Sequence, residues 1–378
     1  MSEMQGLTAN TEPLISRKLH AIGRRLGTPV SGTFELTAGC NFNCEMCYIH
    51  QKGTAHRQND ELTASDWLEI GKQATAAGTV FLLLTGGEPL LRPDFAEIYT
   101  GLKQMGLMIS INTNGSLLTG ETATLLEKNP PVRLNVSLYA DTPEGYRLQC
   151  GADAYERVIE NIRRMKNAGV ETKLNISFTS RNADRMRQME ALTRELGLHC
   201  QVSFYMYPPV RRENGCADTT RLSPAAAGRG RVDWELTHNG SAGAIRSAEL
   251  LRELTQKECE SADAPSEGVR CRAGHTAYWI DHTGQLLMCG MLPKKCGSVL
   301  TDGFTACWQN ARALMQTIRM PAKCTACGLR SVCCVCPAAC YAETGDFETA
   351  PPYLCEMSSA IAGRLGKLQK EEKDVRSE

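Results

Sequence analysis

Cysteine is the residue that most constrains this chain, because 18 of its 378 residues are cysteines and they are unevenly distributed. One group lies within eight residues, and eleven more lie between residues 271 and 355. Thiols that only fill a hydrophobic core have no reason to recur at short fixed spacings, whereas metal and cluster ligands do. We therefore expect iron or another metal to organise much of the fold. The isolated cysteines, which we interpret as packing residues, are Cys150, Cys200 and Cys216.

Charge and targeting signals exclude several classes of partner. The chain has 42 basic and 42 acidic residues, so it has no overall field that would hold nucleic acid or an anionic membrane. The first residues, MSEMQGLTANTEPL, lack the charged and apolar regions of a signal peptide. No stretch approaches the roughly 18 apolar residues of a membrane span. We expect a cytoplasmic protein without nucleic-acid or membrane partners, in which reducing conditions disfavour disulfides.

The hydrophobic pattern predicts alternating strands and helices up to about residue 208. Amphipathic segments such as AYERVIENIRRMKNAG separate short apolar runs rich in branched residues. This alternation is typical of an α/β fold with parallel strands, in an open doubly wound sheet or a full or partial barrel. Functional residues should then gather at the carboxyl ends of the strands. The six predicted strands are 33–38, 80–85, 107–113, 132–139, 173–179 and 200–206.

Beyond residue 208 the pattern changes. A Gly/Ala/Arg-rich stretch around 224–231 is typical of a linker, and the cysteine-rich part that follows has little regular periodicity. The charged C-terminus predicts a solvated helix that frays. The predicted organisation is an N-terminal extension (1–32), a core (33–208), a linker or helical connection (209–265), a cysteine-rich domain (266–357) and a charged tail (358–378).

The first cysteine group follows the first predicted strand in the sequence AGCNFNCEMCYIH. Cys40, Cys44 and Cys47 form a CxxxCxxC array, which can hold three irons of a four-iron cube and leave the fourth without a protein ligand. An iron with an open position can bind and activate a small molecule. The alternative is a structural zinc site, for which His50 is the only nearby fourth ligand.

This array resembles the signature of the radical S-adenosylmethionine (SAM) superfamily, except that Met46 stands where an aromatic residue is usual. The resemblance implies a partial (β/α)6 TIM-like barrel and anaerobic chemistry. It also implies a [4Fe-4S] cluster on Cys40, Cys44 and Cys47 whose open iron is chelated by SAM. Reductive cleavage of SAM then yields methionine and a 5′-deoxyadenosyl radical, which abstracts a hydrogen atom from the substrate.

Three further strand ends resemble SAM-binding segments of the same family. The second strand ends in LLTGGEPLLRPDF, whose two glycines permit close backbone approach. The resemblance assigns the amino group of SAM to Thr85, Gly86, Gly87 and Glu88, and it adds Asn114 and Ser137 from the next two strand ends. Either Arg147 or Arg157 could bind the SAM carboxylate, and the sequence does not choose between them.

The C-terminal cysteines resemble a SPASM domain, which in relatives holds two auxiliary [4Fe-4S] clusters. Gly284 is expected to close a hairpin between two cysteine-bearing strands. By position, the cluster farther from the active site takes Cys324, Cys327, Cys333 and Cys355, and the nearer cluster takes Cys271, Cys289 and Cys336. The fourth ligand of the nearer cluster is open among Cys259, Cys296 and Cys340, or is absent. Zinc knuckles are the alternative for the same cysteine pairs.

Auxiliary clusters can carry an electron to or from a substrate radical, so we expect an oxidoreductase that modifies or cross-links a peptide or protein. A reduced ferredoxin- or flavodoxin-like protein is the expected electron donor. Only 39 residues precede Cys40, too few for a leader-binding domain of about 80 residues. The alternatives are dehydrogenation of a small molecule, sulfatase activation, which Gly290 disfavours because those relatives carry Asp there, and a zinc-binding interaction module without catalysis.

Three more residues were considered as acid–base or radical partners. Tyr205 and Tyr207 follow the sixth predicted strand, where a substrate should approach, and Asp281 lies in the predicted hairpin. Tyrosines at such positions more often pack against neighbours, so we assign no role to them from the sequence.

Overall fold

The computed structural model describes residues 14–48, 61–209, 220–260, 269 and 271–377, and one curved sheet of nine strands forms the centre of this part of the chain. The strand order is β6-β5-β4-β3-β2-β1-β7-β8-β9. Strands β1 to β6 and β7 pair in parallel, whereas β8 and β9 pair antiparallel. The strands are β1 (Ser31–Glu35), β2 (Phe81–Thr85), β3 (Met108–Thr113), β4 (Arg133–Ser137), β5 (Thr172–Ser177), β6 (His199–Ser203), β7 (Ala277–Ile280), β8 (Gln285–Cys289) and β9 (Leu292–Ser298).

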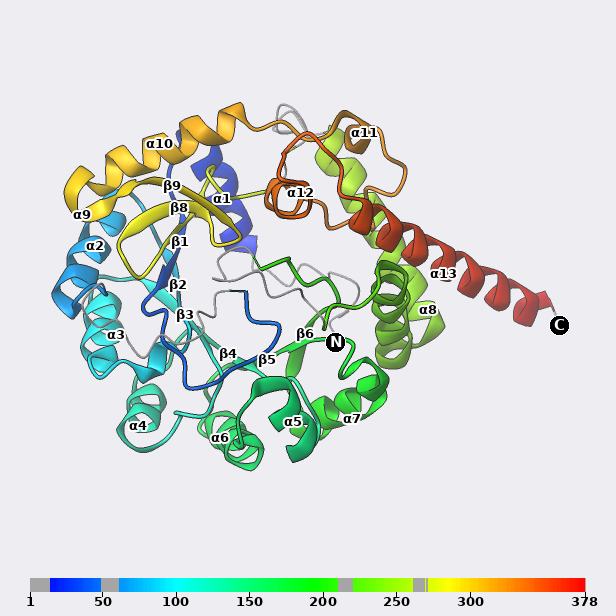
Figure 1. Ribbon diagram of the computed structural model, residues 1–378, viewed down its shortest axis with the longest axis horizontal. Helices are drawn as coiled ribbons and strands as arrows, with labels where there is room; N and C mark the ends of the chain where they lie inside the picture. Colours follow the sequence, from blue (N-terminus) through cyan, green and yellow to red (C-terminus); the bar gives the residue numbers. More distant parts are fainter. Residues whose placement is uncertain (1–13, 49–60, 210–219, 261–268, 270, 378) are drawn as a thin grey trace.

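Helices cover the outside of this sheet, as Figure 1 shows in a view into the partial barrel. The barrel part carries α1 (Leu14–Leu26), α2 (Ala64–Ala76), α3 (Phe95–Gln104), α4 (Gly120–Lys128), α5 (Pro143–Cys150), α6 (Tyr155–Asn167) and α7 (Met186–Leu196), with short 3-10 turns η1 (Pro89–Leu91) and η2 (Ala183–Arg185). The remainder carries α8 (Pro224–Glu260), α9 (Val299–Asp302), α10 (Phe304–Thr317), α11 (Ala322–Thr325), α12 (Pro337–Thr344) and α13 (Pro352–Ser377).

Alternating side chains give the barrel strands two different faces. In β4, Leu134 and Val136 are fully buried, whereas Asn135 and Ser137 are half-buried. Successive strand residues point to opposite faces, so the apolar set packs under the outer helices and the polar set faces the barrel interior. Asn135 Nδ2 donates to Asn112 Oδ1 of β3 at 2.9 Å on this inner face. The interior is therefore polar on these strands.

The predicted α/β alternation is confirmed, and each of the six predicted strands overlaps an observed parallel strand. The predicted hairpin is also present between β7 and β8, where Gly284 adopts a φ of +80°. Cys289 ends β8 as expected, but Cys271 precedes β7 and is not in a strand.

The strand β7 connects the cysteine-rich region directly to the barrel. It pairs in parallel with β1, with Thr33 beside Trp279 and Phe34 beside Ile280. The indole Nε1 of Trp279 also donates to Glu35 Oε2 at 2.8 Å. The two regions that the sequence separates thus share one sheet.

The stretch around 224–231, expected to be a linker or part of a helical connection, is helical. It forms the first turns of α8, where Ala227 is fully buried. Gly228 lies against the Met357 carbonyl of α13, so the small residues there allow two helices to approach closely. The helix bends sharply at Gly240, whose φ is +71°.

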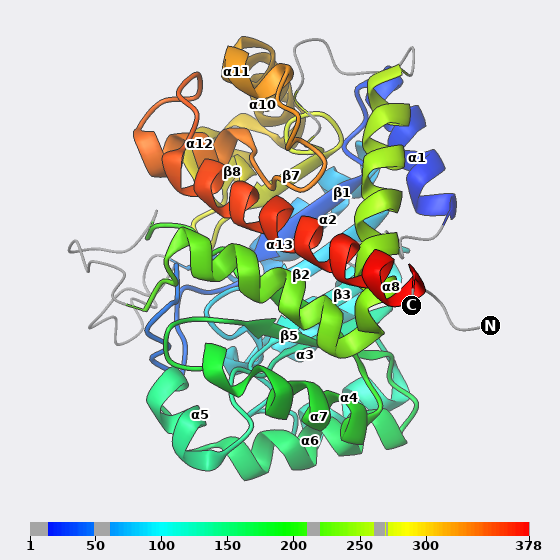
Figure 2. The ribbon, with the colours of Figure 1, turned by 90° about the vertical axis from the view of Figure 1, so that its right-hand side faces the viewer.

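The charged C-terminal segment is also packed for much of its length, contrary to the expected frayed tail. Figure 2 shows α13 lying across α8. Arg364 Nε contacts Asp233 Oδ1 of α8 at 2.9 Å. Apolar residues recur at helical spacing on the side of α13 that packs, and those that are buried are Leu354, Met357, Ile361, Leu365 and Leu368.

Among the described helices, none combines the length and the apolar character that a bilayer span requires.

Candidate functional site

The loop after β1 carries the first three cysteines at the carboxyl end of the barrel strands. Cys40, Cys44 and Cys47 are half-buried and none is in a disulfide. The Cys47 N–H donates to the Cys44 carbonyl at 3.2 Å, which makes a tight turn between those two positions. The Asn43 N–H donates to the Cys150 carbonyl at 2.9 Å, so the loop is fastened to the end of α5.

These three thiols are close enough to influence one another electrostatically. Burial raises the pKa of Cys40 to about 12, and the charges of Glu88, Cys44 and Cys47 act in the same direction. A hydrogen bond with Cys150, together with burial, raises the pKa of Cys44. Without a positive partner the thiols of Cys40 and Cys44 would stay protonated near neutral pH, so a metal that binds them must displace their protons. Cys150, which appeared isolated in the sequence, proves to be a neighbour of Cys44.

The donor set suits a four-iron cube. In the described ranges, no three His, Cys, Asp or Glu side chains gather closely enough to surround a single metal ion. Thiolates that hold a cube bind separate irons and therefore stand farther apart than the ligands of one ion. Three neighbouring thiols on one loop, none of them in a disulfide, fit that arrangement, and Cys40, Cys44 and Cys47 are the residues that would hold it.

The two glycines after β2 allow the next loop to pack directly against the cysteine loop. The Gly87 N–H donates to the Thr37 carbonyl and the Glu88 N–H donates to the Gly39 carbonyl, both at 2.8 Å. A β-carbon on Gly87 would stand 2.2 Å from the Gly39 carbonyl oxygen, and one on Gly86 would stand 2.6 Å from that of Thr37. Glycine is therefore required at this contact. Thr85, the last residue of β2, is buried beside it.

The Glu88 carboxylate is fully buried and bonded within the protein. Oε1 accepts from Thr113 Oγ1 at 2.8 Å and from the Leu90 N–H at 3.0 Å, and Oε2 accepts from the Asn114 N–H at 2.7 Å. Burial raises its pKa to about 7, although these three donors oppose the rise. The carboxylate thus ties the end of β2 to the end of β3, and its predicted contact with SAM stays a prediction.

Asn114 connects the end of β3 to the cysteine loop. Its Nδ2 donates to Asn41 Oδ1 at 2.9 Å and lies 3.9 Å from Cys40 Sγ, and its Oδ1 accepts from Ser116 Oγ at 2.7 Å. Ser137 ends β4 on the inner, polar face of the barrel. Both predicted positions therefore lie at strand ends on the side where the cysteine loop sits.

The two candidate arginines for the SAM carboxylate lie on outer helices. Arg147 is on α5 and its NH2 is 3.7 Å from Asp153 Oδ1, with both side chains more than half exposed. Arg157 is exposed on α6. Neither side chain has a described contact with the cysteine loop, so the choice between them stays open.

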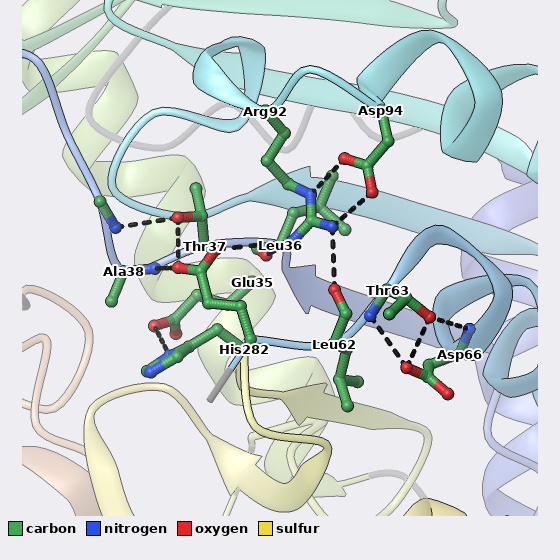
Figure 3. Close-up of polar contacts among 12 residues, drawn as sticks. Glu35, Leu36, Thr37, Ala38, Leu62, Thr63, Asp66, Arg92, Asp94 and His282 are labelled. Carbon is green, nitrogen blue, oxygen red and sulfur yellow. Dashed lines mark hydrogen bonds and ion pairs between the residues drawn. The ribbon is translucent and has the colours of Figure 1, made fainter. Parts of the chain in front are cut away.

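Arg92 fastens both ends of the segment that contains the cysteines, as Figure 3 shows. Its NH1 donates to the Leu36 carbonyl before the cysteines and its NH2 donates to the Leu62 carbonyl after them, both at 2.8 Å. Asp94 holds the guanidinium through two further bonds of 2.8 and 2.7 Å. The side chain is only 8% exposed, so this contact forms away from solvent.

Glu61 completes this clamp from the far end of the same segment. Its Oε1 accepts from Thr37 Oγ1 at 2.5 Å and from the Ala38 N–H at 3.1 Å, while Oε2 lies 3.6 Å from Arg92 NH1. Sequence reasoning missed Arg92 and Glu61. The only available signal was the position of Arg92 four residues after Glu88, and it does not reveal that its partners are backbone carbonyls.

The C-terminal cysteines fall into two neighbouring groups. Burial raises the pKa of Cys271 and the charge of Cys336 adds to the rise. The Tyr207 hydroxyl lies 3.2 Å from Cys336 Sγ, and the charges of Cys336 and Cys289 both raise the pKa of that hydroxyl after burial does. Cys336 thus has both Cys271 and Tyr207 as neighbours, and Cys289 also lies near Tyr207.

The second group surrounds Cys324. Burial raises the pKa of Cys324, and the charges of Cys355, Cys333 and Cys327 raise it further. These are the four cysteines that the sequence assigned to the farther auxiliary cluster, and the structure brings them together. Whether either group holds a cluster stays a prediction.

The three candidates for a fourth ligand of the nearer group differ in their surroundings. Cys340 is fully buried one helical turn after Cys336, and burial followed by the charges of Cys324 and Cys336 raises its pKa to about 12. Cys296 lies in β9, with its charge acting on Cys307 of α10. The side chain of Cys259 lies outside the described part, as do Cys216 and His50. Cys340 therefore lies near cysteines of both groups, Cys336 of the nearer one and Cys324 and Cys333 of the farther one.

Tyr205 and Asp281, the other two candidate acid–base or radical partners, form hydrogen bonds within the protein. The Tyr205 hydroxyl donates to Glu343 Oε1 at 2.8 Å. Asp281 Oδ1 accepts from the Thr283 N–H and from Thr283 Oγ1 at 2.9 and 2.7 Å. Asp281 thus stabilises the turn between β7 and β8.

Comparison with known proteins identifies the barrel part. Residues 34–189 match the sequence family described as the Radical SAM superfamily. An AdoMet-dependent heme synthase of Methanosarcina barkeri is 29% identical over 340 residues, which cover 85% of this chain and 94% of that protein. A probable GTP 3′,8-cyclase of Saccharolobus islandicus is 38% identical over 178 residues, or 46% of this chain and 56% of that protein.

Two solved structures share the fold across nearly the whole chain. Streptococcus suis SuiB bound to its precursor peptide SuiA has a TM-score of 0.65 at 18% identity, covering 90% of this chain and 80% of that chain. The protein anSMEcpe with bound AdoMet and Cp18Cys peptide has a TM-score of 0.69 at 18% identity, covering 92% and 99%. The likeness extends beyond the barrel, so it includes the cysteine-rich region.

Proposed function

The chain belongs to the radical SAM superfamily, and from this premise we propose that it is an oxidising enzyme that acts on a peptide or protein. The supporting observation is the junction of three strand ends. There Cys40, Cys44 and Cys47, none of them in a disulfide, lie on a loop that is bonded to Gly87 and, through Asn41, to Asn114. This junction offers thiolates for a cluster and backbone and amide groups for a small polar ligand.

When bound, a four-iron cluster would supply the electron for reductive cleavage of SAM, which would allow hydrogen-atom abstraction from the substrate. The residues of the chain hold and orient the reactants. Cys40, Cys44 and Cys47 bind the cluster, and Thr85, Gly86, Gly87, Glu88, Asn114 and Ser137 form the SAM site. Arg92 and Glu61 fix the ends of the cysteine segment, which limits how far the thiols can move.

We further propose that the C-terminal groups hold two auxiliary [4Fe-4S] clusters, as in a SPASM domain. Mutual electrostatic effects within each group support this, since they require the thiols to be neighbours. A cluster pair beside the barrel gives an oxidative reaction an internal electron acceptor. A reduced ferredoxin- or flavodoxin-like protein is the proposed donor for the first cluster.

A peptide or protein substrate is supported by the fold and by the polar interior. SuiB and anSMEcpe both have structures with bound peptides and resemble this chain over at least 90% of its length. The inner face of the barrel carries amides such as Asn112 and Asn135, which can donate to and accept from a peptide backbone.

Sulfatase activation is less well supported. A β-carbon on Gly290 would stand 2.8 Å from the Trp279 ring, so the Asp that such relatives carry there would require the indole to move.

A second candidate is a small-molecule substrate related to heme synthesis. The relatives named AdoMet-dependent heme synthase align with 85% of this chain at 29% and 26% identity, compared with 18% identity for SuiB and anSMEcpe. The polar inner face also carries Arg133 and Lys173, which could bind the carboxylates of a small molecule.

The test uses the full chain, reconstituted with iron and sulfide without oxygen and incubated with SAM and dithionite. Wild type should release 5′-deoxyadenosine, Cys44→Ala should release less than about one hundredth as much, and the control Cys200→Ala should match wild type. Peptides encoded beside the gene and carboxylated tetrapyrroles are then compared as substrates by mass spectrometry. Nucleoside release by Cys44→Ala at the wild-type rate would contradict the proposal, and turnover of tetrapyrrole alone would replace peptide as the substrate.

A further inference from the structure

The hydroxyl of Tyr207 meets the sulfur of Cys336 where the barrel joins the cysteine-rich region. Tyr207 follows the end of β6 by four residues, and Cys336 is the N-terminal capping residue of α12. The oxygen–sulfur distance is 3.2 Å. A thiolate bound to iron carries no hydrogen, so in a cluster-loaded protein the tyrosine must be the donor.

Several neighbours hold this hydroxyl in position. The Tyr207 ring packs edge-on against Tyr205 at a centroid distance of 4.9 Å. Tyr205 in turn donates to Glu343 in the last turn of α12, and Arg221 pairs with the same carboxylate. The chain after β6 is therefore attached to both ends of α12, through Cys336 at its start and Glu343 near its end.

The three sulfurs of the nearer cysteine group each accept a hydrogen bond from a backbone N–H at 3.4 Å. Cys271 accepts from Ala273, Cys289 from Met291 and Cys336 from Ala339. When a cluster is bound, Cys336 would also accept a hydrogen bond from the Tyr207 hydroxyl. Hydrogen bonds to ligand sulfurs are one of the means by which a protein sets the reduction potential of an iron–sulfur cluster.

We propose that Tyr207 is a positioning residue that raises the reduction potential of the nearer auxiliary cluster by donating a hydrogen bond to Cys336. This inference rests on the proposed function, which supplies that cluster. The physical reason is that a donor stabilises the more negatively charged, reduced form more than the oxidised form. A higher potential makes the cluster a better electron acceptor beside the barrel.

The test measures potential and not activity. The full chain is prepared with Cys40, Cys44 and Cys47 replaced by alanine, so that only auxiliary clusters assemble, and is titrated potentiometrically with electron paramagnetic resonance. Tyr207→Phe should move one midpoint potential to a more negative value at unchanged iron content. The matched control Tyr99→Phe, which loses a hydroxyl that bonds to the Asn129 carbonyl among the outer helices, should leave both midpoints unchanged.

A second substitution covers the case in which Tyr207→Phe does not fold. Tyr207→3-fluorotyrosine keeps the ring and makes the hydroxyl a stronger donor, so the same midpoint should become more positive. A merely structural role would not produce shifts of opposite sign. Equal midpoints in wild type and the variants, with equal iron, would overturn the inference alone. A triple-alanine background that takes up no iron would overturn the auxiliary clusters of the proposed function and this inference with them.

Discussion

Gly87 illustrates how a residue can be required for a reason different from the one its motif suggests. The sequence indicated close approach of its backbone to a ligand, whereas the structure shows close approach to the Gly39 carbonyl of the cysteine loop. Both contacts need the missing side chain. A motif therefore indicates where a backbone must come close, but its partner is visible only in three dimensions.

Glu88 predicts a pH dependence of stability in the cluster-free protein. Its folded pKa of about 7 lies above the ordinary value of 4.5, so the folded form holds a proton that the unfolded form has lost between these values. The protonated Glu88 side chain therefore contributes to the free energy of unfolding fully below pH 4.5, and this contribution is lost as the pH rises through 7. The contribution is on the order of 3 kcal/mol.

Urea unfolding at pH 5 and pH 8 measures this effect. Wild type should lose more stability between the two values than Glu88→Gln, which cannot ionise. The variant is expected to be less stable at both, because an amide nitrogen would face the Asn114 N–H. A surface control is Glu97→Gln on α3, which should follow wild type. Parallel profiles for wild type and Glu88→Gln would refute the assignment.

At the scale of elements, the strands were predictable from the sequence, but the hydrogen bonds of Arg92 that hold the segment after β1 were not. The apolar runs of β1 to β6 have a clear local signal, and their parallel pairing followed from the alternation with helices, whereas their order in the sheet did not. The clamp of Arg92 depends on two carbonyls that are 26 residues apart, Leu36 and Leu62, and every residue has a carbonyl. Composition and spacing contain no information about which of them will meet.

Arg92→Lys should weaken this clamp. An ammonium cannot reproduce the two bonds to Asp94 together with the bonds to Leu36 and Leu62. We expect a loss of roughly 2 to 4 kcal/mol in the free energy of unfolding and lower iron uptake at limiting iron. Chemical denaturation and iron analysis check this.

The matched control is Arg163→Lys, because Arg163 forms an ion pair with Glu195 in which both side chains are more than half exposed. It should cost less than about 1 kcal/mol. Equal effects of the two substitutions would show that the buried position of Arg92 has no special importance.

At the scale of the whole molecule, the packing of two long helices, α8 and α13, was not predictable from their composition. The charges of the last 20 residues suggested a solvated tail, but Ile361, Leu365 and Leu368 recur on one side and are buried. The stretch around 224–231 is rich in glycine, which is common in linkers, yet here glycine lets α8 approach α13. Helical spacing within a charged segment was the signal that could have found this packing.

Leu365→Ala tests the contribution of α13. Its side chain is 3% exposed, so its truncation should lower the free energy of unfolding by about 2 to 5 kcal/mol. Lys367→Ala, two residues along on the exposed side, should change it by less than about 0.5 kcal/mol. Denaturant titration of both variants measures the free energy of unfolding. An unchanged value for Leu365→Ala would show that the packing of α13 does not stabilise the protein.

The pairing of β7 with β1 restricts how proteins of this shape can change in length. Side chains alternate along a strand, so one inserted residue in β7 would exchange its inward and outward faces and remove Trp279 from Glu35. An insertion in the connection between α7 and β6 would disturb no such pairing. Natural insertions and deletions should therefore be tolerated in connections and rejected in β1 and β7.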